Sequence, residues 1–111
     1  MGTPTNDFDI AGQAIRELEQ SSLQFAAFVR TLSLSKYQNA SVERAAIMQF
    51  YRSGTSVAAN IRESKYAESS KDLLHKLKIA EKELAECSYW VGLLSQPPAL
   101  FTDLEDENMV R

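Results

Sequence analysis

Three stretches of the chain carry apolar residues at helical spacing, and short polar segments separate them. In the first stretch, from about Asn6 to about Ser33, apolar positions recur every three or four residues, which predicts a long bundle helix. Ala26, Ala27 and Phe28 widen its apolar face beyond that of a two-stranded coiled coil. The predicted seam consists of Phe8, Ala11, Ile15, Leu18, Ser22, Phe25, Val29 and Leu32.

A second helix is predicted after a loop at residues 34–40, which contains Ser, Tyr and Asn. Ser41 has the side chain of an N-cap, Glu43 in the first turn suits the helix dipole, and the helix runs to about Ala67. Gly54 in its interior costs about 1 kcal/mol relative to Ala, so we expect a neighbouring backbone to approach closely there. Its apolar stripe is Ala46, Phe50, Val57 and Ile61, flanked by Ile47 and Ala58.

The third predicted helix starts at a capping box formed by Ser69 and Asp72 and runs to about Ser95. Pro97 and Pro98 end it, because the residue before a proline avoids the helical region. Ile79 and Trp90 flank its seam, where Trp90 would anchor packing or a subunit contact. The seam consists of Leu73, Leu77, Ala80, Leu84, Cys87, Val91 and Leu94.

A second capping box, at Thr102 and Glu105, predicts a fourth helix of barely two turns before Arg111. Long amphipathic helices joined by short loops pack as antiparallel neighbours. The sequence therefore predicts one all-α domain over residues 1–111, an antiparallel up-down four-helix bundle with three long helices and a short fourth. Such a bundle leaves apolar surface where a full fourth helix would lie, and oligomerisation would cover it.

Composition places the chain among ordinary globular proteins, with 111 residues, 44% hydrophobic and 24% charged. Only four glycines and three prolines are present, which agrees with a mostly helical chain. One cysteine, Cys87, excludes an internal disulfide and suits a reducing cytosol. No membrane-spanning run or signal peptide is recognisable, so we expect a cytoplasmic protein.

The charge is unevenly distributed along the chain. Residues 36–82 hold nine Lys and Arg against five Asp and Glu, a balance of +4, although the net charge is −3. Charge asymmetry of this kind can mark a surface that binds a polyanion, or it can be a mixture of solvated faces. Both interpretations stay open at this point.

A polar stripe runs along the second predicted helix, at spacings of four, four and three residues that place it on one face. It consists of Arg52, Ser56, Asn60 and Glu63, with small residues between them. One interpretation makes Asn60 and Glu63 nucleic-acid ligands. The favoured one is structural, with Asn60 hydrogen-bonded across helices and Glu63 paired with Arg52 or with a basic residue of a neighbouring helix or subunit.

The middle of the chain, roughly residues 45–95, resembles the bacterial family of proteins encoded by intervening sequences in 23S ribosomal RNA genes. The matching residues are Arg52-Ser-Gly-Thr-Ser56-Val-Ala-Ala-Asn60-Ile-Arg-Glu63, Ser70-Lys71-Asp72, Lys76-Leu-Lys-Ile-Ala80-Glu-Lys-Glu-Leu84 and Tyr89-Trp90. The chain departs from the family in its short fourth helix. It also has Ser64-Lys65 where many relatives have a glycine.

This resemblance implies a cytoplasmic four-helix bundle that assembles into a ring-like homo-oligomer, a pentamer. Members of the wider family have no established enzymatic activity, so we expect no catalysis, and no cofactor is expected either. A related protein, the accessory variability determinant of diversity-generating retroelements, looks similar in fold, binds nucleic acid and works with a reverse transcriptase. The resemblance therefore favours a nucleic-acid-binding protein over an enzyme.

The best candidates for contacts to RNA or DNA are six basic residues of the second and third helices: Arg62, Lys65, Lys71, Lys76, Lys78 and Lys82. Lys71, Lys78 and Lys82 share one face of the third helix, and each phosphate contact adds salt-sensitive affinity. Tyr66 would stack on a base or pack at the helix end. Acidic neighbours interrupt the set, so a solvated face with helical ion pairs is the alternative.

The sequence gives little support to metal binding or to cysteine catalysis. Asp72 and His75 form an acid–x–x–His pair, but with one histidine in the chain a two-metal site inside a subunit is excluded. Asp72 has a sufficient role at the helix start, and Cys87 is expected to be a small core residue without an activating base. A metal-handling bundle would need ligands from several subunits.

The leading hypothesis is a non-catalytic, oligomeric helical bundle that binds nucleic acid, most simply RNA. The alternative is a structural or adaptor protein that binds a protein partner such as a reverse transcriptase. Its contact surfaces would be the open side of the bundle and the acidic stretch at residues 103–107.

Overall fold

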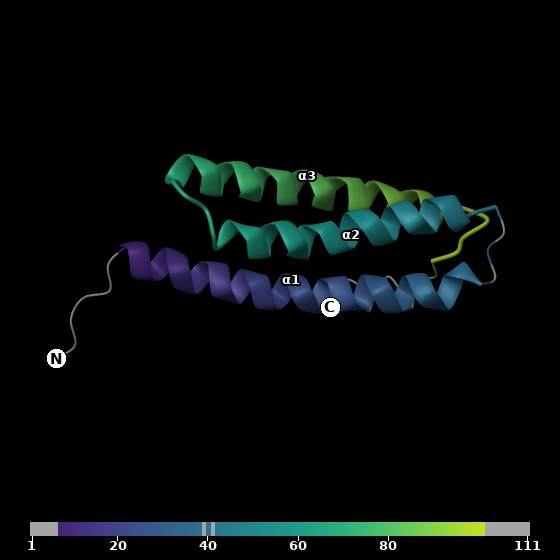
Figure 1. Ribbon diagram of the computed structural model, residues 1–111. Coiled ribbons are helices and arrows are strands. Elements are labelled where there is room, and N and C mark those ends of the chain that lie inside the picture. The colour runs from purple at the N-terminus through teal and green to yellow at the C-terminus, as the bar shows by residue number, and fades with distance from the viewer. Residues whose placement is uncertain (1–6, 39, 41, 102–111) are drawn as a thin grey trace.

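The computed structural model describes residues 7–38, 40 and 42–101, and these residues form three helices and no strand. The helices lie side by side with alternating direction (Figure 1) and are α1 (Asp7–Tyr37), α2 (Arg44–Ser64) and α3 (Ser70–Leu94). The prediction of an all-α fold is confirmed. Three helices are seen among the described residues. The predicted fourth helix, with its capping box at Thr102 and Glu105, lies outside them, as do the side chains of Phe8, Ala11 and Ser41.

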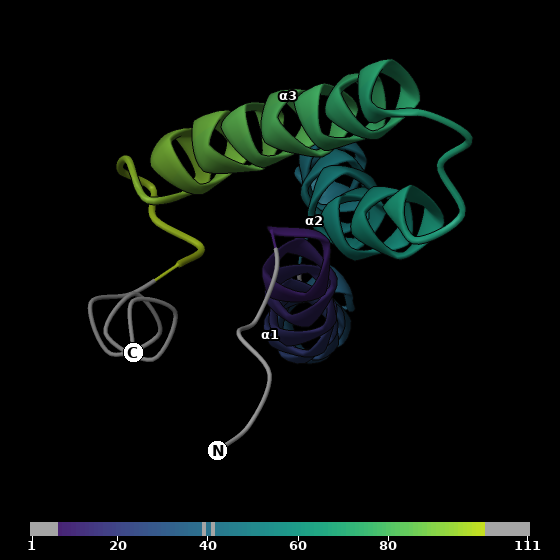
Figure 2. The ribbon, with the colours of Figure 1, turned by 90° about the vertical axis from the view of Figure 1, so that its left-hand side faces the viewer.

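The central helix is α2, which packs against both of its neighbours, whereas α1 and α3 barely contact each other. A view along the bundle shows α2 between the other two (Figure 2). Among the described residues, one flank of α1 and one flank of α3 therefore have no helical neighbour. Leu18 and Leu84, both predicted to be seam residues, are 44% and 48% exposed there.

Most of the predicted seam residues do form the core. The larger cluster includes Val29, Phe50 and Cys87, one from each helix, and a smaller cluster joins Val57 and Ile61 to Ala80. Ser53 of α2 is fully buried beside them, and Gly54 is buried as well. The close approach predicted at Gly54 is present, but it involves side chains rather than a backbone.

The first loop is shorter than predicted because α1 continues to Tyr37 instead of ending at Ser33. Arg44 donates hydrogen bonds to the carbonyl oxygens of Tyr37 at 3.0 Å and Gln38 at 3.3 Å, and its guanidinium lies over the Tyr37 aromatic ring. These bonds satisfy carbonyls that a helix end leaves without partners. The same arginine opens α2, whose N-cap position is Glu43 and not Ser41.

The start of α3 agrees with its predicted capping box. Ser69 Oγ accepts the backbone N–H of Asp72 at 3.0 Å, while the Asp72 carboxylate accepts the N–H of Glu68, one residue earlier than a capping box requires. After α3 the chain turns back, and the N–H groups of Leu100 and Phe101 donate to the Leu94 carbonyl. Phe101 thereby becomes a core residue, with its aromatic ring 5.0 Å from that of Phe50.

Within the part of the chain that the structure describes, none of the helices combines the length and hydrophobicity needed to span a lipid bilayer.

Candidate nucleic-acid interface

Three of the six candidate basic residues line the outer face of α3. Lys71, Lys78 and Lys82 are all exposed, and their spacing of seven and four residues keeps them on one side of the helix. The buried residues Ala80 and Cys87 lie about half a turn away, toward α2. We call Lys71, Lys78 and Lys82 the lysine row.

The other three basic residues point in different directions. Lys65 Nζ lies 3.0 Å from Glu19 Oε2, so this side chain is directed toward α1 and its charge is already paired. Arg62 is exposed three residues earlier, on the same side of α2. Lys76 is half-buried and four residues before buried Ala80, on the flank of α3 that faces α2. The basic residues therefore do not form one continuous surface within a single chain.

The acidic neighbours of the lysine row are arranged so that they interfere little with it. Asp72 is engaged at the helix start by the N–H of Glu68. Glu81 lies 3.5 Å from Lys78, but both side chains are about two-thirds or more exposed, at 72% and 67%. Such exposed pairs contribute about 0–1 kcal/mol, so Lys78 can exchange Glu81 for a phosphate at small cost.

The polar stripe of α2 has a structural role at its first position. Arg52 donates to Glu86 Oε1 at 2.6 Å and to Glu83 Oε2 at 3.3 Å, which links α2 to α3. We call Arg52, Glu83 and Glu86 the Arg52 cluster. The hydrogen bond from Arg52 lowers the pKa of Glu86 below its usual value and so keeps this carboxylate charged.

The rest of the stripe differs from the sequence-based prediction. Asn60 donates to the Ser56 carbonyl at 2.8 Å, inside α2 rather than across helices. Arg52 pairs with α3 instead of with Glu63, and Glu63 is exposed. Ser56 and Asn60 are half-buried, whereas Arg52 and Glu63 are exposed, so the stripe lies along the edge of the packed face of α2.

Tyr89, which the sequence offers only as part of the motif Tyr89-Trp90, lies on the outer face of α3. It follows Lys82 by seven residues and Lys71 by eighteen, which is five full turns, so it continues the lysine row. Its side chain is 58% exposed, and its aromatic ring lies 4.9 Å from that of Trp90 at an angle of 60°. The heptad-like spacing from Lys82 was a sufficient signal for this placement.

Cys87 and His75 are the other residues considered for catalysis or metal binding. Cys87 is 2% exposed, and burial raises the pKa of its thiol to about 11, so it is a protonated core residue at neutral pH. His75 is exposed on α3. Among the residues that the structure describes, no three His, Cys, Asp or Glu side chains gather as metal ligands would.

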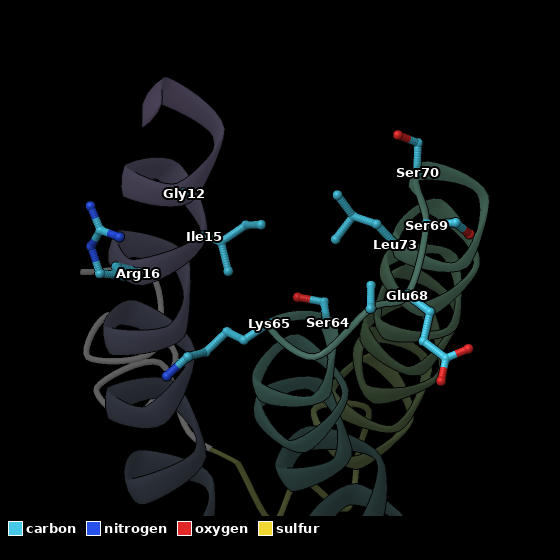
Figure 3. Close-up of a pocket in the computed structure, with 10 residues that line it drawn as sticks. Gly12, Ile15, Arg16, Ser64, Lys65, Glu68, Ser69, Ser70 and Leu73 are labelled. Carbon is cyan, nitrogen blue, oxygen red and sulfur yellow. The ribbon is translucent and has the colours of Figure 1, made fainter. Parts of the chain in front are cut away.

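A pocket of about 700 Å³ opens where α1 diverges from α3. Figure 3 shows Ile15 of α1 and Leu73 of α3 pointing toward each other across it, with Ser64 of α2 at its floor. Arg16 lies at the rim and points away from the space. The pocket is therefore suited to apolar side chains more than to a phosphate group.

Two comparisons with known proteins found matches. The family model described as 23S rRNA-intervening sequence protein matches residues 16–102. Among solved structures, the chain is similar to a protein of unknown function from the S23 ribosomal protein family of Bacteroides thetaiotaomicron, with 36% sequence identity, 83% of each chain covered and a TM-score of 0.75. No curated protein matches the chain. The matched residues include the lysine row, Tyr89 and the Arg52 cluster.

Proposed function

Because the chain belongs to the 23S rRNA-intervening sequence protein family, we propose that it is a non-catalytic RNA-binding protein whose lysine row contacts the RNA backbone. The observation that supports this proposal most is the placement of Lys71, Lys78 and Lys82 on one exposed face of α3. At about 1.5 Å per helical residue, the three side chains are spread over about 17 Å along the helix axis. A row of this length follows a nucleic-acid strand and contacts several phosphates.

The proposed active form is a cytoplasmic homo-oligomer, with five copies in a ring as the family resemblance implies. Each contacted phosphate releases counterions, so repeating the lysine row around a ring multiplies both affinity and its salt dependence. Leu18 and Leu84 are exposed on the flank between α1 and α3. This exposed apolar surface is an argument for a fourth helix that covers it and completes the bundle. Apolar surface left beyond that helix would be covered in the oligomer.

Fluorescence anisotropy tests the proposal. A labelled ribosomal RNA stem and a matched DNA duplex are titrated with the protein at low and at physiological salt. We expect tight RNA binding that weakens steeply as salt rises. Replacing Lys78 and Lys82 by Ala should weaken binding and lower the salt slope by about one unit for each lost phosphate contact.

The matched control replaces Arg16 and Arg30 by Ala, because this variant removes the same charge from exposed positions of α1. The proposal requires the control variant to bind like the unmodified protein. Equal losses in the two variants would mean that RNA responds to net charge and not to the lysine row. No binding at low salt would make the lysine row a solvated face.

The pocket between α1 and α3 favours a second candidate function, an adaptor that binds a protein such as a reverse transcriptase. Ile15 and Leu73 provide its apolar walls, and a partner would insert an apolar side chain between them. Under this alternative, Leu73→Lys should abolish co-purification of the partner after nuclease treatment and leave RNA affinity unchanged. Loss of RNA binding in the same variant would count against two separate surfaces.

A further inference from the structure

We propose that Tyr89 is a stacking platform for an unpaired base, which gives the RNA site along α3 a preference for single-stranded or looped segments over fully paired ones. The inference rests on the proposed function, because it concerns the same face of α3. Tyr89 lies in line with Lys78 and Lys82, about 10 Å beyond the latter along the helix axis. A strand whose phosphates contact the lysines therefore reaches this aromatic ring with its next nucleotides.

The surroundings of Tyr89 suit stacking. More than half of its side chain, 58%, is exposed, so a base can reach the aromatic ring. Trp90 supports it from one side at 4.9 Å and packs in turn against the core residues. A supported aromatic side chain loses little conformational freedom when it binds, which favours affinity.

A negative charge near the platform is held away by the Arg52 cluster. Glu86 lies four residues after Lys82 and three before Tyr89, where its carboxylate would repel a phosphate. The 2.6 Å hydrogen bond from Arg52 draws this carboxylate toward α2 and compensates part of its charge, since Arg52 also binds Glu83. The conspicuous arginine of the sequence motif thus keeps the path between the lysine row and Tyr89 open to a polyanion.

The chemistry of stacking requires that the base received by Tyr89 is not paired. Bases inside a paired helix are already stacked on each other, so an aromatic side chain can receive only a base that is splayed out of a loop, bulge or single strand. The lysine row by itself does not distinguish these forms, because phosphates are common to all of them. Tyr89 adds the preference for unpaired RNA.

Tyr66, at 71%, is another exposed tyrosine near basic residues and is more exposed than Tyr37, whose ring is covered by Arg44. Tyr66 lies in the turn after α2, beside Lys65, whose ammonium group is paired with Glu19. It has no place in the lysine row. Tyr66→Ala is therefore the matched control for Tyr89→Ala, since both variants remove one exposed phenol ring.

The test uses a single-stranded RNA oligonucleotide with one 2-aminopurine base and a fully paired RNA of the same sequence, both titrated with the full chain. Base stacking on Tyr89 should quench the 2-aminopurine fluorescence. Tyr89→Ala should weaken single-strand binding roughly 5- to 160-fold and leave duplex binding unchanged, since one base–aromatic contact is worth about 1–3 kcal/mol. Tyr89→Phe and Tyr66→Ala should both bind like the unmodified protein.

Three results would overturn the inference, and they are distinguishable from one another. Unchanged single-strand affinity in Tyr89→Ala would remove the platform while leaving the lysine row intact. Equal losses for both RNAs would assign Tyr89 a structural role, which the helical circular dichroism of the variant would report separately. If the unmodified protein bound neither RNA, the proposed function would fail together with the inference.

Discussion

At the residue scale, the contacts of Arg52 explain why the polar stripe of α2 contains an arginine. Arg52 hydrogen-bonds two carboxylates that lie 31 and 34 residues away in the chain, on a different helix. An arginine suits this position because its planar guanidinium donates in two directions at once. The sequence indicated a structural role for Arg52, but local spacing cannot reveal a partner on another helix. The partners of Arg52 are Glu83 and Glu86 and not Glu63.

The Arg52 cluster predicts a pH-dependent stability. Because Arg52 lowers the pKa of Glu86 in the folded protein, the unfolded chain binds protons more readily at acidic pH. The cluster therefore stabilises the fold above about pH 4.3, the ordinary value for glutamate, and this contribution is lost as the pH falls through the lower folded pKa. Urea unfolding should show Arg52→Gln less stable than the unmodified protein at neutral pH, with the difference shrinking at about pH 3.

Lys78→Gln provides the control for this measurement, because it breaks the exposed pair with Glu81. Such a pair contributes little at any pH, so the urea midpoint should hardly change. A stability difference for Arg52→Gln that stays constant from neutral to acidic pH would show that Arg52 acts by packing and not through the Glu86 carboxylate.

At the element scale, the order and type of the three described helices were predictable, whereas helix ends depended on distant partners. The start of α3 followed from Ser69 and Asp72, which act locally. The end of α1 did not, because Arg44 supplies the missing hydrogen-bond donors from beyond the loop. Phe101 was missed as a core residue for the same reason, since only the return of the chain after α3 brings it against Phe50.

Gly54 and Gly92 provide opposite predictions for the same substitution. A Cβ at Gly54 would lie 2.8 Å from both γ-methyl groups of Val29 and 3.3 Å from the Cys87 sulfur, whereas a Cβ at Gly92 would meet nothing within 4 Å. Gly54→Ala should therefore destabilise the fold by about 1–3 kcal/mol, even after a gain of about 1 kcal/mol in helix propensity. Gly92→Ala should stabilise it by about 0.5–1 kcal/mol.

Chemical denaturation of the two variants measures both effects. Val29 is fully buried and β-branched, so it cannot rotate away from a new methyl group without disturbing the contact between α1 and α2. Equal or higher stability of Gly54→Ala would show that the two helices can separate slightly without loss. Helix propensity would then outweigh packing at this position.

At the scale of the whole molecule, the sequence could identify the candidate basic residues but not the face on which each one lies. Spacing within a helix groups Lys71, Lys78 and Lys82 correctly, because all three belong to α3. Spacing does not tell how α2 is rotated relative to the other helices. Only the folded chain shows this rotation, as in the ion pair between Lys65 and Glu19 of α1. The structure thus places three of the six candidates in one row on α3, and Tyr89 continues that row.

The central claim, that RNA lies along the lysine row of α3, is tested most directly by lysine footprinting. The protein is acetylated with and without the ribosomal RNA stem, and the modification of each lysine is quantified by mass spectrometry. We expect RNA to protect Lys71, Lys78 and Lys82 while Lys65 on the α1 side of α2 is unaffected, because a bound phosphate shields only the amines that it contacts. Protection of Lys65 without protection of Lys78 and Lys82, or equal modification of all lysines with and without RNA, would contradict the claim.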